Sequence, residues 1–148
     1  MLDPVRWLPL GGGPLPGKLR LLDQTLLPTQ VVYLELDELP LIADAIKRLV
    51  VRGAPAIGIA AAMGLTAVMQ HHQGLAPVQF LAKAREVAAV LDATRPTAVN
   101  LGWALRRCLA MLDQAASAGA SSADLALKLC REAEIILQQD IASCRAIG

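Results

Sequence analysis

The stretch that most constrains how this chain can fold is VVRGAPAIGIAAAMGL, which occupies residues 50–65. Gly53 can adopt backbone angles that other residues avoid, so Arg52-Gly53 is expected to form a sharp turn. Pro55 suits the first turn of a helix, because its missing N–H would have no intrahelical partner there. The small residues that follow allow close packing. The pattern therefore predicts the end of one helix, a turn, and the start of a second, buried helix.

The start of this second helix is also a candidate anion site. A helix N-terminus presents free N–H groups and the positive end of the helix dipole. Arg52, directly before it, adds a planar set of donors suited to phosphate or carboxylate. The alternative is a tight helix–helix turn that carries a surface arginine, and turns of this kind are common. The residues alone leave both interpretations open.

A second break, RPTAVNL at residues 95–101, repeats the arrangement. Arg95 precedes Pro96, and a helix is expected to begin at about Ala98. Two such turns in one small domain could bring two guanidinium groups and two sets of backbone donors to a single anion. Chance recurrence of a common helix-start pattern is the other explanation, and the spacing does not decide between them.

Composition indicates one domain with a sizeable core. The chain has 148 residues, of which 55% are hydrophobic and 18% charged, with a formal net charge of +1. A nucleic-acid surface would need a concentrated basic patch or base-stacking aromatics, and aromatic residues are only 3%, so we expect no nucleic-acid partner. The longest apolar run, residues 54–69, is shorter than the roughly 20 residues of a membrane span, so we expect no membrane partner.

The expected fold class is α+β, mainly α. Three short strand candidates are followed by five helical patterns of 3.6-residue period. The strands are expected at 5–8, 19–22 and 31–36, and the helices at 39–50, 55–74, 77–91, 98–117 and from 122 nearly to the terminus. Ser121 and Asp124 resemble a capping box for the last helix. This gives a small antiparallel sheet over 5–36 and a helical bundle over 39–145.

Two other features are candidates for chemical sites. The glycine run at 11–13 lacks the Lys-Ser/Thr and the helix of a phosphate loop, so a hairpin connection is expected. His71 and His72 are adjacent and point about 100° apart on a helix, so they cannot share a metal ion. We expect no metal site and no cofactor.

The three cysteines are expected to be buried structural thiols. Cys108, Cys130 and Cys144 are widely spaced and lie on apolar helical faces, where a free cysteine behaves as a small hydrophobe. An odd, scattered set of this kind favours reduced thiols in a cytoplasmic protein over a disulfide framework.

Four motifs together closely resemble the methylthioribose-1-phosphate isomerase family. They are VVRGAPAIGIAAAMGL at 50–65, LLDQTLLP at 21–28, TRPTAVNLGWAL at 94–105 and DIASCRAIG at 140–148. The match runs in order along essentially the whole chain. The resemblance implies an enzyme of methionine salvage that converts 5-methylthioribose 1-phosphate into 5-methylthioribulose 1-phosphate. It also implies that Arg52, Gly53, Ala54 and Arg95 bind substrate.

The family's catalytic cysteine and aspartate belong to a C-terminal Rossmann-like domain, at positions that would lie beyond Gly148. None of Cys108, Cys130 or Cys144 occupies the place of that cysteine, so the resemblance identifies this chain with the N-terminal domain alone. We therefore expect no catalytic residue here and no appreciable turnover. A homodimer is expected for the full-length protein.

Two alternatives remain beside this prediction. A relative could act on another sugar phosphate, such as 5-deoxyribose 1-phosphate or ribose 1,5-bisphosphate. A non-catalytic regulatory subunit, like those of the nucleotide-exchange factor for translation initiation, would share the fold. The presence of both the Arg52 turn and the Arg95 turn favours the isomerase.

Overall fold

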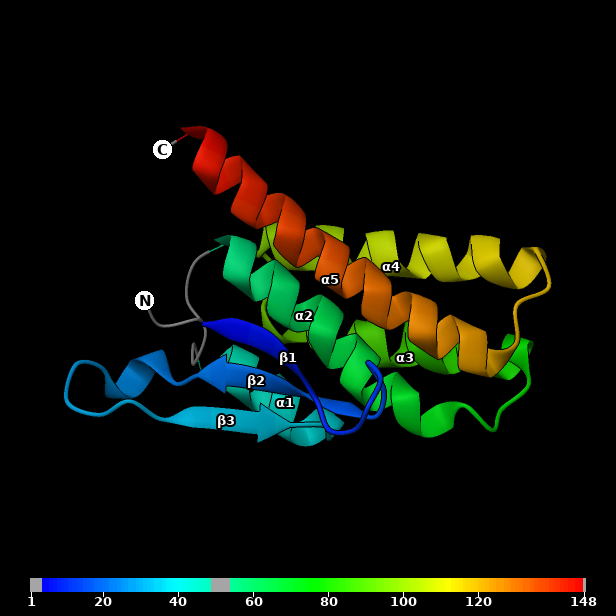
Figure 1. Ribbon diagram of the computed structural model, residues 1–148, viewed down its shortest axis with the longest axis horizontal. Helices are drawn as coiled ribbons and strands as arrows, with labels where there is room; N and C mark the ends of the chain where they lie inside the picture. Colours follow the sequence, from blue (N-terminus) through cyan, green and yellow to red (C-terminus); the bar gives the residue numbers. More distant parts are fainter. Residues whose placement is uncertain (1–3, 49–53, 148) are drawn as a thin grey trace.

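The computed structural model describes residues 4–48 and 54–147, with side-chain surroundings for 4–48 and 55–142. It confirms the predicted α+β, mainly α fold (Figure 1). The strands are β1 (Val5–Pro9), β2 (Gly17–Leu22) and β3 (Tyr33–Leu36), and the helices are α1 (Leu39–Lys47), α2 (Ala54–Met69), α3 (Pro77–Thr94), α4 (Val99–Ser117) and α5 (Ser122–Ile147). Two short 3-10 helices are η1 (Gln24–Leu26) and η2 (Gln70–His72).

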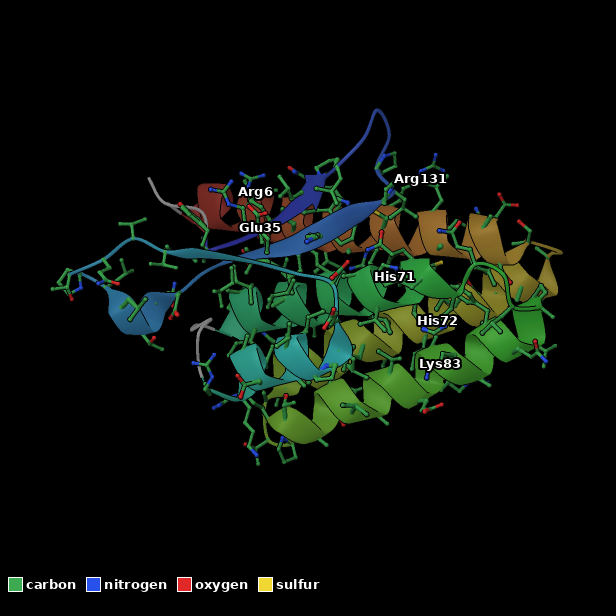
Figure 2. The ribbon with its side chains drawn as sticks, turned by 90° about the horizontal axis from the view of Figure 1, so that it is seen from below. Arg6, Glu35, His71, His72, Lys83 and Arg131 are labelled. Carbon is green, nitrogen blue, oxygen red and sulfur yellow. The ribbon has the colours of Figure 1, made fainter. Side chains whose placement is uncertain are left out.

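The three strands form an antiparallel sheet in the order β1-β2-β3. Alternation along β2 buries Leu19 and Leu21 in the core, while Arg20 points to the other face. Arg20 pairs in register with Arg6 on β1 and with Glu35 on β3, and Figure 2 shows Arg6 and Glu35 on this sheet. The sheet therefore has one apolar face for the helices and one charged face.

The β1–β2 connection is a hairpin loop, as predicted for the glycine run. The indole Nε1 of Trp7 donates a hydrogen bond to the carbonyl of Pro14, at 2.7 Å. Behind the loop, the buried amide of Gln70 accepts from the Gly17 N–H at 2.9 Å and donates to the Gly17 carbonyl at 2.7 Å. Gln70 thus pairs with β2 much as a neighbouring strand would, and it fastens the hairpin to the end of α2.

Helix α2 is the centre of the molecule. Every residue from Ile57 to Gln70 is buried, and the helix packs against α4 and α5 most extensively, and also against the sheet, α1 and α3 (Figure 1). Small side chains make this possible, because they let several neighbours approach one helix. A helix that is apolar all round is typical of a fully buried position.

Several element boundaries differ from those expected. Strand β3 begins at Tyr33, two residues late, after η1, which the sequence analysis did not foresee. Asp23 caps η1 by accepting a hydrogen bond from the Thr25 N–H at 3.0 Å. Helix α1 ends at Lys47 with Arg48 as its C-cap, before its predicted end at residue 50, and residues 49–50 lie outside the described residues.

Helix α3 is longer than predicted and continues to Thr94. Arg95 then leaves the helical region with φ −147° and ψ 73°, as expected for the residue before Pro96. In the described part of the chain, none of the helices has both the length and the apolar character that crossing a membrane requires.

Helix α5 begins and continues as predicted. Its capping box is confirmed, since the Asp124 N–H donates to the Ser121 hydroxyl at 3.1 Å and the Asp124 carboxylate accepts from the Ser121 N–H at 3.5 Å. The helix continues to Ile147, slightly past the predicted limit of the bundle at residue 145. Gly148 lies outside the described residues. The resemblance puts the catalytic cysteine and aspartate beyond Gly148, and that remains a prediction.

Candidate functional site

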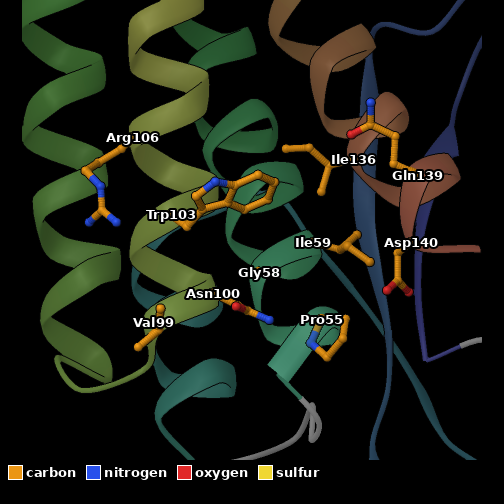
Figure 3. Close-up of a pocket in the computed structure, with 10 residues that line it drawn as sticks. All are labelled: Pro55, Gly58, Ile59, Val99, Asn100, Trp103, Arg106, Ile136, Gln139 and Asp140. Carbon is orange, nitrogen blue, oxygen red and sulfur yellow. The ribbon is translucent and has the colours of Figure 1, made fainter. Parts of the chain in front are cut away.

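A cleft of about 440 Å³ opens where α2, α4 and α5 meet (Figure 3). Its walls come from the first turns of α2, the first turns of α4 and the C-terminal half of α5. The lining residues are Pro55, Gly58, Ile59, Val99, Asn100, Trp103, Arg106, Ile136, Gln139 and Asp140. A cleft of this size, largely apolar with a few polar groups, is typical of a small-molecule site.

The cleft forms because the starts of α2 and α4 cross at close range. A Cβ atom built on Gly58 would lie 2.9 Å from the backbone oxygen of Asn100, so glycine is needed for this approach. The two proline-marked helix starts of the sequence analysis therefore lie beside one another. Ala54 is the first residue of α2, whereas Arg52 and Gly53 lie outside the described residues.

Arg95 lies between α3 and α4. Its N–H donates to the Asp92 carbonyl at 3.3 Å, and its carbonyl accepts from the Ala98 N–H at 3.0 Å, so its backbone links the two helices. Its side-chain Nε is buried and has no hydrogen-bond partner among the described residues. A buried donor without a partner is costly, which makes this group receptive to an acceptor. That Arg52 and Arg95 meet at one anion remains a prediction.

The start of α4 offers further donors. Its N-cap residue is Ala98, which has no side-chain oxygen, and no side chain caps the helix among the described residues. The first N–H groups of an α-helix have no intrahelical acceptors, so at α4 they can donate to a ligand or to water where no described residue accepts from them. An anion at this helix start would also be stabilised by the helix dipole.

The charged groups of the cleft are Arg106 and Asp140. A Cβ atom built on Gly102 would lie 3.0 Å from Nη1 of Arg106 and 3.3 Å from Oδ1 of Asp92. The Arg106 guanidinium therefore lies over Gly102 on the side of α3, facing the Asp92 carboxylate. Figure 3 shows it on the other side of α4 from the Trp103 ring, while Asp140 approaches the cleft from α5. A further guanidinium borders the cleft, since Arg107 lies over the Trp103 ring at 5.5 Å from its centroid and donates to Oε1 of Gln139 at 2.7 Å.

The described cysteines are unsuited to nucleophilic chemistry. Cys108 and Cys130 are buried, as predicted. Burial, with a smaller contribution from Glu132, raises the pKa of Cys108 to about 12, and burial with Glu134 raises the pKa of Cys130 to about 11. Both thiols stay protonated at neutral pH, whereas a nucleophilic cysteine needs a lowered pKa. The side chain of Cys144 lies outside the described side chains.

The two histidines lie at the other end of α2 from the cleft (Figure 2). Nε2 of His71 is 3.3 Å from the Asp37 carboxylate, which ties η2 to the turn after β3. Burial, and then the nearby Lys83, lowers the pKa of His72. The contact with Asp37 indicates a structural role for His71.

Sequence reasoning did not anticipate the wall formed by Trp103, Ile136 and Asp140. One signal was present: Trp103 falls one turn after Val99 on the outward side of an amphipathic helix, and both side chains are exposed, 46% for Trp103 and 77% for Val99. Large apolar side chains exposed together mark binding surfaces more often than isolated ones do.

The fold and the cleft define a mainly helical domain with a small-molecule-sized site at the crossing of two helix starts. The chain belongs to the initiation factor 2 subunit family, whose profile matches residues 50–148. This agrees with the resemblance found in the motifs, because the curated relatives of the chain include methylthioribose-1-phosphate isomerases.

Two relatives illustrate the likeness. The methylthioribose-1-phosphate isomerase of Pelotomaculum thermopropionicum is 44% identical over 148 residues, which is 100% of this chain and 38% of the relative. The 5-deoxyribose 1-phosphate isomerase of Moorella thermoacetica is 45% identical over 134 residues, 89% of this chain and 37% of the relative. The chain thus spans little more than a third of the length of these proteins.

Two solved structures share the fold. The 5-methylthioribose 1-phosphate isomerase of Pyrococcus horikoshii matches 82% of this chain with a TM-score of 0.76 and 31% identity, over 34% of its own chain. The delta subunit of translation initiation factor eIF-2B from A. fulgidus matches 95% of this chain with a TM-score of 0.79 and 33% identity, over 38% of its own chain. The fold therefore occurs both in an enzyme and in a translation factor subunit.

Proposed function

We propose that this chain is the substrate-gripping part of an aldose–ketose isomerase that converts 5-methylthioribose 1-phosphate into 5-methylthioribulose 1-phosphate. The reaction breaks the ring bond between C1 and O4, moves the hydrogen on C2 to C1, and transfers the proton of the C2 hydroxyl to O4, which leaves a carbonyl at C2 and a hydroxyl at C4. Substrate and product are isomers, so no atom is gained or lost overall. The phosphate on C1 blocks ordinary ring opening, so the enzyme must hold it firmly throughout.

In this proposal Arg52, Gly53, Ala54 and Arg95 bind the phosphate end of the substrate. The observation that carries it is the crossing of the α2 and α4 starts, where Gly58 brings the two helices together. The unpaired buried Nε of Arg95 and the uncapped start of α4 add donors. Charged hydrogen bonds to a phosphate are stronger than neutral ones, which suits a group that has to stay bound during ring opening.

We assign the acid–base step to residues beyond Gly148. The raised pKa values of Cys108 and Cys130 make these two thiols unsuitable as acid–base groups at neutral pH. We therefore expect the 148-residue chain to bind the substrate without turning it over. Phosphorus NMR of methylthioribose 1-phosphate with this chain tests that directly. Ketose phosphate formed at a useful rate would overturn this part of the proposal.

Activity is tested in a fusion of this chain with the part of the Pelotomaculum relative that follows the matched segment. The match to this relative covers 100% of the chain. Arg95→Ala in the fusion should lower kcat/KM by roughly 10- to 150-fold, the loss of one hydrogen bond to a charged group. Arg85→Ala is the matched control, because exposed Arg85 pairs with Asp113 at 2.6 Å and does not line the cleft. Equal activity in the two variants would remove Arg95 from the site.

A second candidate is isomerisation of 5-deoxyribose 1-phosphate, the substrate named for the 45% identical Moorella relative. The phosphate grip would be the same, and only the group on C5 would differ. A non-catalytic regulatory role is the third, by likeness to the eIF-2B delta subunit. It predicts no phosphate affinity at the helix starts.

A further inference from the structure

We propose that Arg107 is a positioning residue of the cleft. It ties α4 to α5 and holds two lining side chains in place, Trp103 from α4 and Gln139 from α5, without lining the cleft itself. The effect that we expect on substrate affinity rests on the proposed function, whereas the effect that we expect on the Trp103 ring does not.

The Arg107 guanidinium makes three contacts. Its Nη1 donates a hydrogen bond to Oε1 of Gln139 at 2.7 Å, and its Nη2 lies 3.5 Å from Oε2 of Glu132. Its Cζ lies 5.5 Å from the centroid of the Trp103 ring, within the range of a cation–π contact. Glu132 and Gln139 lie about two turns apart on α5, so a single side chain of α4 engages two turns of the neighbouring helix.

Burial distinguishes this cluster from an ordinary surface ion pair. The side chains of Arg107 and Glu132 are 26% and 15% exposed, whereas those of Arg85 and Asp113, which join α3 to α4, are 56% and 49% exposed. Exposed pairs contribute little, because water and salt screen them and their side chains lose freedom. A guanidinium that is largely withdrawn from water and donates to two partners from one rigid plane is held in a defined orientation.

The cluster acts on the cleft through Trp103 and Gln139. These two residues line it from different helices (Figure 3), whereas Arg107 and Glu132 do not line it. Because the indole is 46% exposed, the core restrains it only in part, and the guanidinium adds a contact that the core does not provide. A lining side chain that is already ordered does not have to be ordered when a ligand binds, which favours binding.

The alternative is that Arg107 only strengthens the packing of α4 against α5. Glu132 separates the two roles, because it contacts Arg107 and does not line the cleft. An effect of Glu132→Gln on Trp103 or on a ligand is therefore expected only through Arg107. A positioning role predicts such an effect, and a packing role predicts a change in stability alone.

The first measurement is the quenching of Trp103 fluorescence by acrylamide in a Trp7→Phe background, where Trp103 is the one tryptophan left in the chain. Arg107→Met keeps the length of the side chain and removes the guanidinium, so the ring should become more accessible and the quenching constant should rise. Glu132→Gln should raise it less, since Arg107 is loosened but still present. Arg85→Met is the matched control, an interhelical arginine that does not line the cleft, and should leave the constant unchanged.

The second measurement is calorimetric binding to the full 148-residue chain. Arg107→Met should raise the dissociation constant of methylthioribose 1-phosphate about 2- to 12-fold, the factor for ordering one freed side chain on binding. Arg107→Lys keeps a cation but lacks the planar set of donors, so its affinity should lie between those of the wild type and Arg107→Met. Inorganic phosphate should bind all variants equally, because the helix starts are unchanged. Urea unfolding of each variant establishes that it is folded.

An unchanged quenching constant in Arg107→Met would overturn this inference. A raised constant with unchanged substrate affinity would also overturn it and restrict Arg107 to packing, as would an equal loss of affinity in Arg85→Met. If Arg107→Met did not fold, Glu132→Gln would decide, since it removes a charge and keeps the shape of the side chain. Absence of methylthioribose 1-phosphate binding in the wild type would count against the proposed function, and the fluorescence comparison would still decide the role of Arg107.

Discussion

The two halves of α2 use glycine in opposite ways. Gly64, in the half that faces α1, the sheet and α3, is surrounded by side chains, since a Cβ there would meet Ile42 at 2.9 Å, Leu19 at 3.8 Å and Leu91 at 3.9 Å. Gly58, in the half that borders the cleft, meets the backbone of Asn100. The first contact closes a core, and the second brings two helix starts together. The closed core and the candidate site thus lie along different halves of one helix.

The largest expected effect tests this separation with two aromatic truncations. Phe80 is fully buried in the closed core, so Phe80→Ala should lower the free energy of unfolding by about 3–5 kcal/mol. Trp103→Ala, at the half-exposed cleft wall, should cost less than about 1 kcal/mol, because little packing is lost. Urea unfolding followed by circular dichroism measures both. Similar losses would mean that the cleft is part of the stabilising core.

Alanine at the two glycines should produce the next largest difference. At Gly58 the new methyl group meets backbone, so α2 and α4 must move apart, and we expect Gly58→Ala to cost about 1–3 kcal/mol. At Gly64 side chains can adjust, and the higher helix propensity of alanine offsets up to about 1 kcal/mol of the strain. Thermal unfolding of both variants provides the comparison. If Gly64→Ala were the more damaging, side-chain crowding would outweigh the backbone contact.

The smallest effect is a pH dependence from the closed core. Burial raises the pKa of Cys108 to about 12 from an ordinary value of 9.0, so above pH 9 the unfolded chain loses this proton while the folded chain keeps it. Stability is complete below pH 9 and falls as the pH rises toward 12, by about 1.4 kcal/mol at pH 10. Cys108→Ala should remove this part of the decline, which urea unfolding at pH 8 and pH 10 would detect. A decline of equal slope in the variant would contradict the assignment.

Most of the fold was predictable because its determinants are local. Apolar periodicity, Pro77 at a helix start and the Ser121–Asp124 capping box specify helices within a few residues. Helix α1 and strand β3 came out shorter than predicted. The 3-10 helix η1 was missed because it depends on one side-chain cap from Asp23, which competes with the extended conformation.

The candidate site was only partly predictable. Proline and arginine marked the two helix starts, but their proximity depends on the packing of α2 against α4, which no local pattern encodes. Asp140 lines the cleft because of where α5 crosses α2 and α4, and that crossing is not visible in the sequence. The turn at Arg52 and Gly53, which carried the strongest motif, remains a prediction.

The two hydrogen bonds between Gln70 and Gly17 affect how far the length of the β1–β2 loop can vary. They fix the position of Gly17, the first residue of β2, against the end of α2. The register of the hairpin therefore does not depend on the loop between β1 and β2. Gly11 and Gly12 are exposed, with no atoms of other residues near their Cβ positions. Insertions and deletions at the tip can therefore be absorbed there without displacing the sheet, which leaves this loop free to diverge in length among relatives.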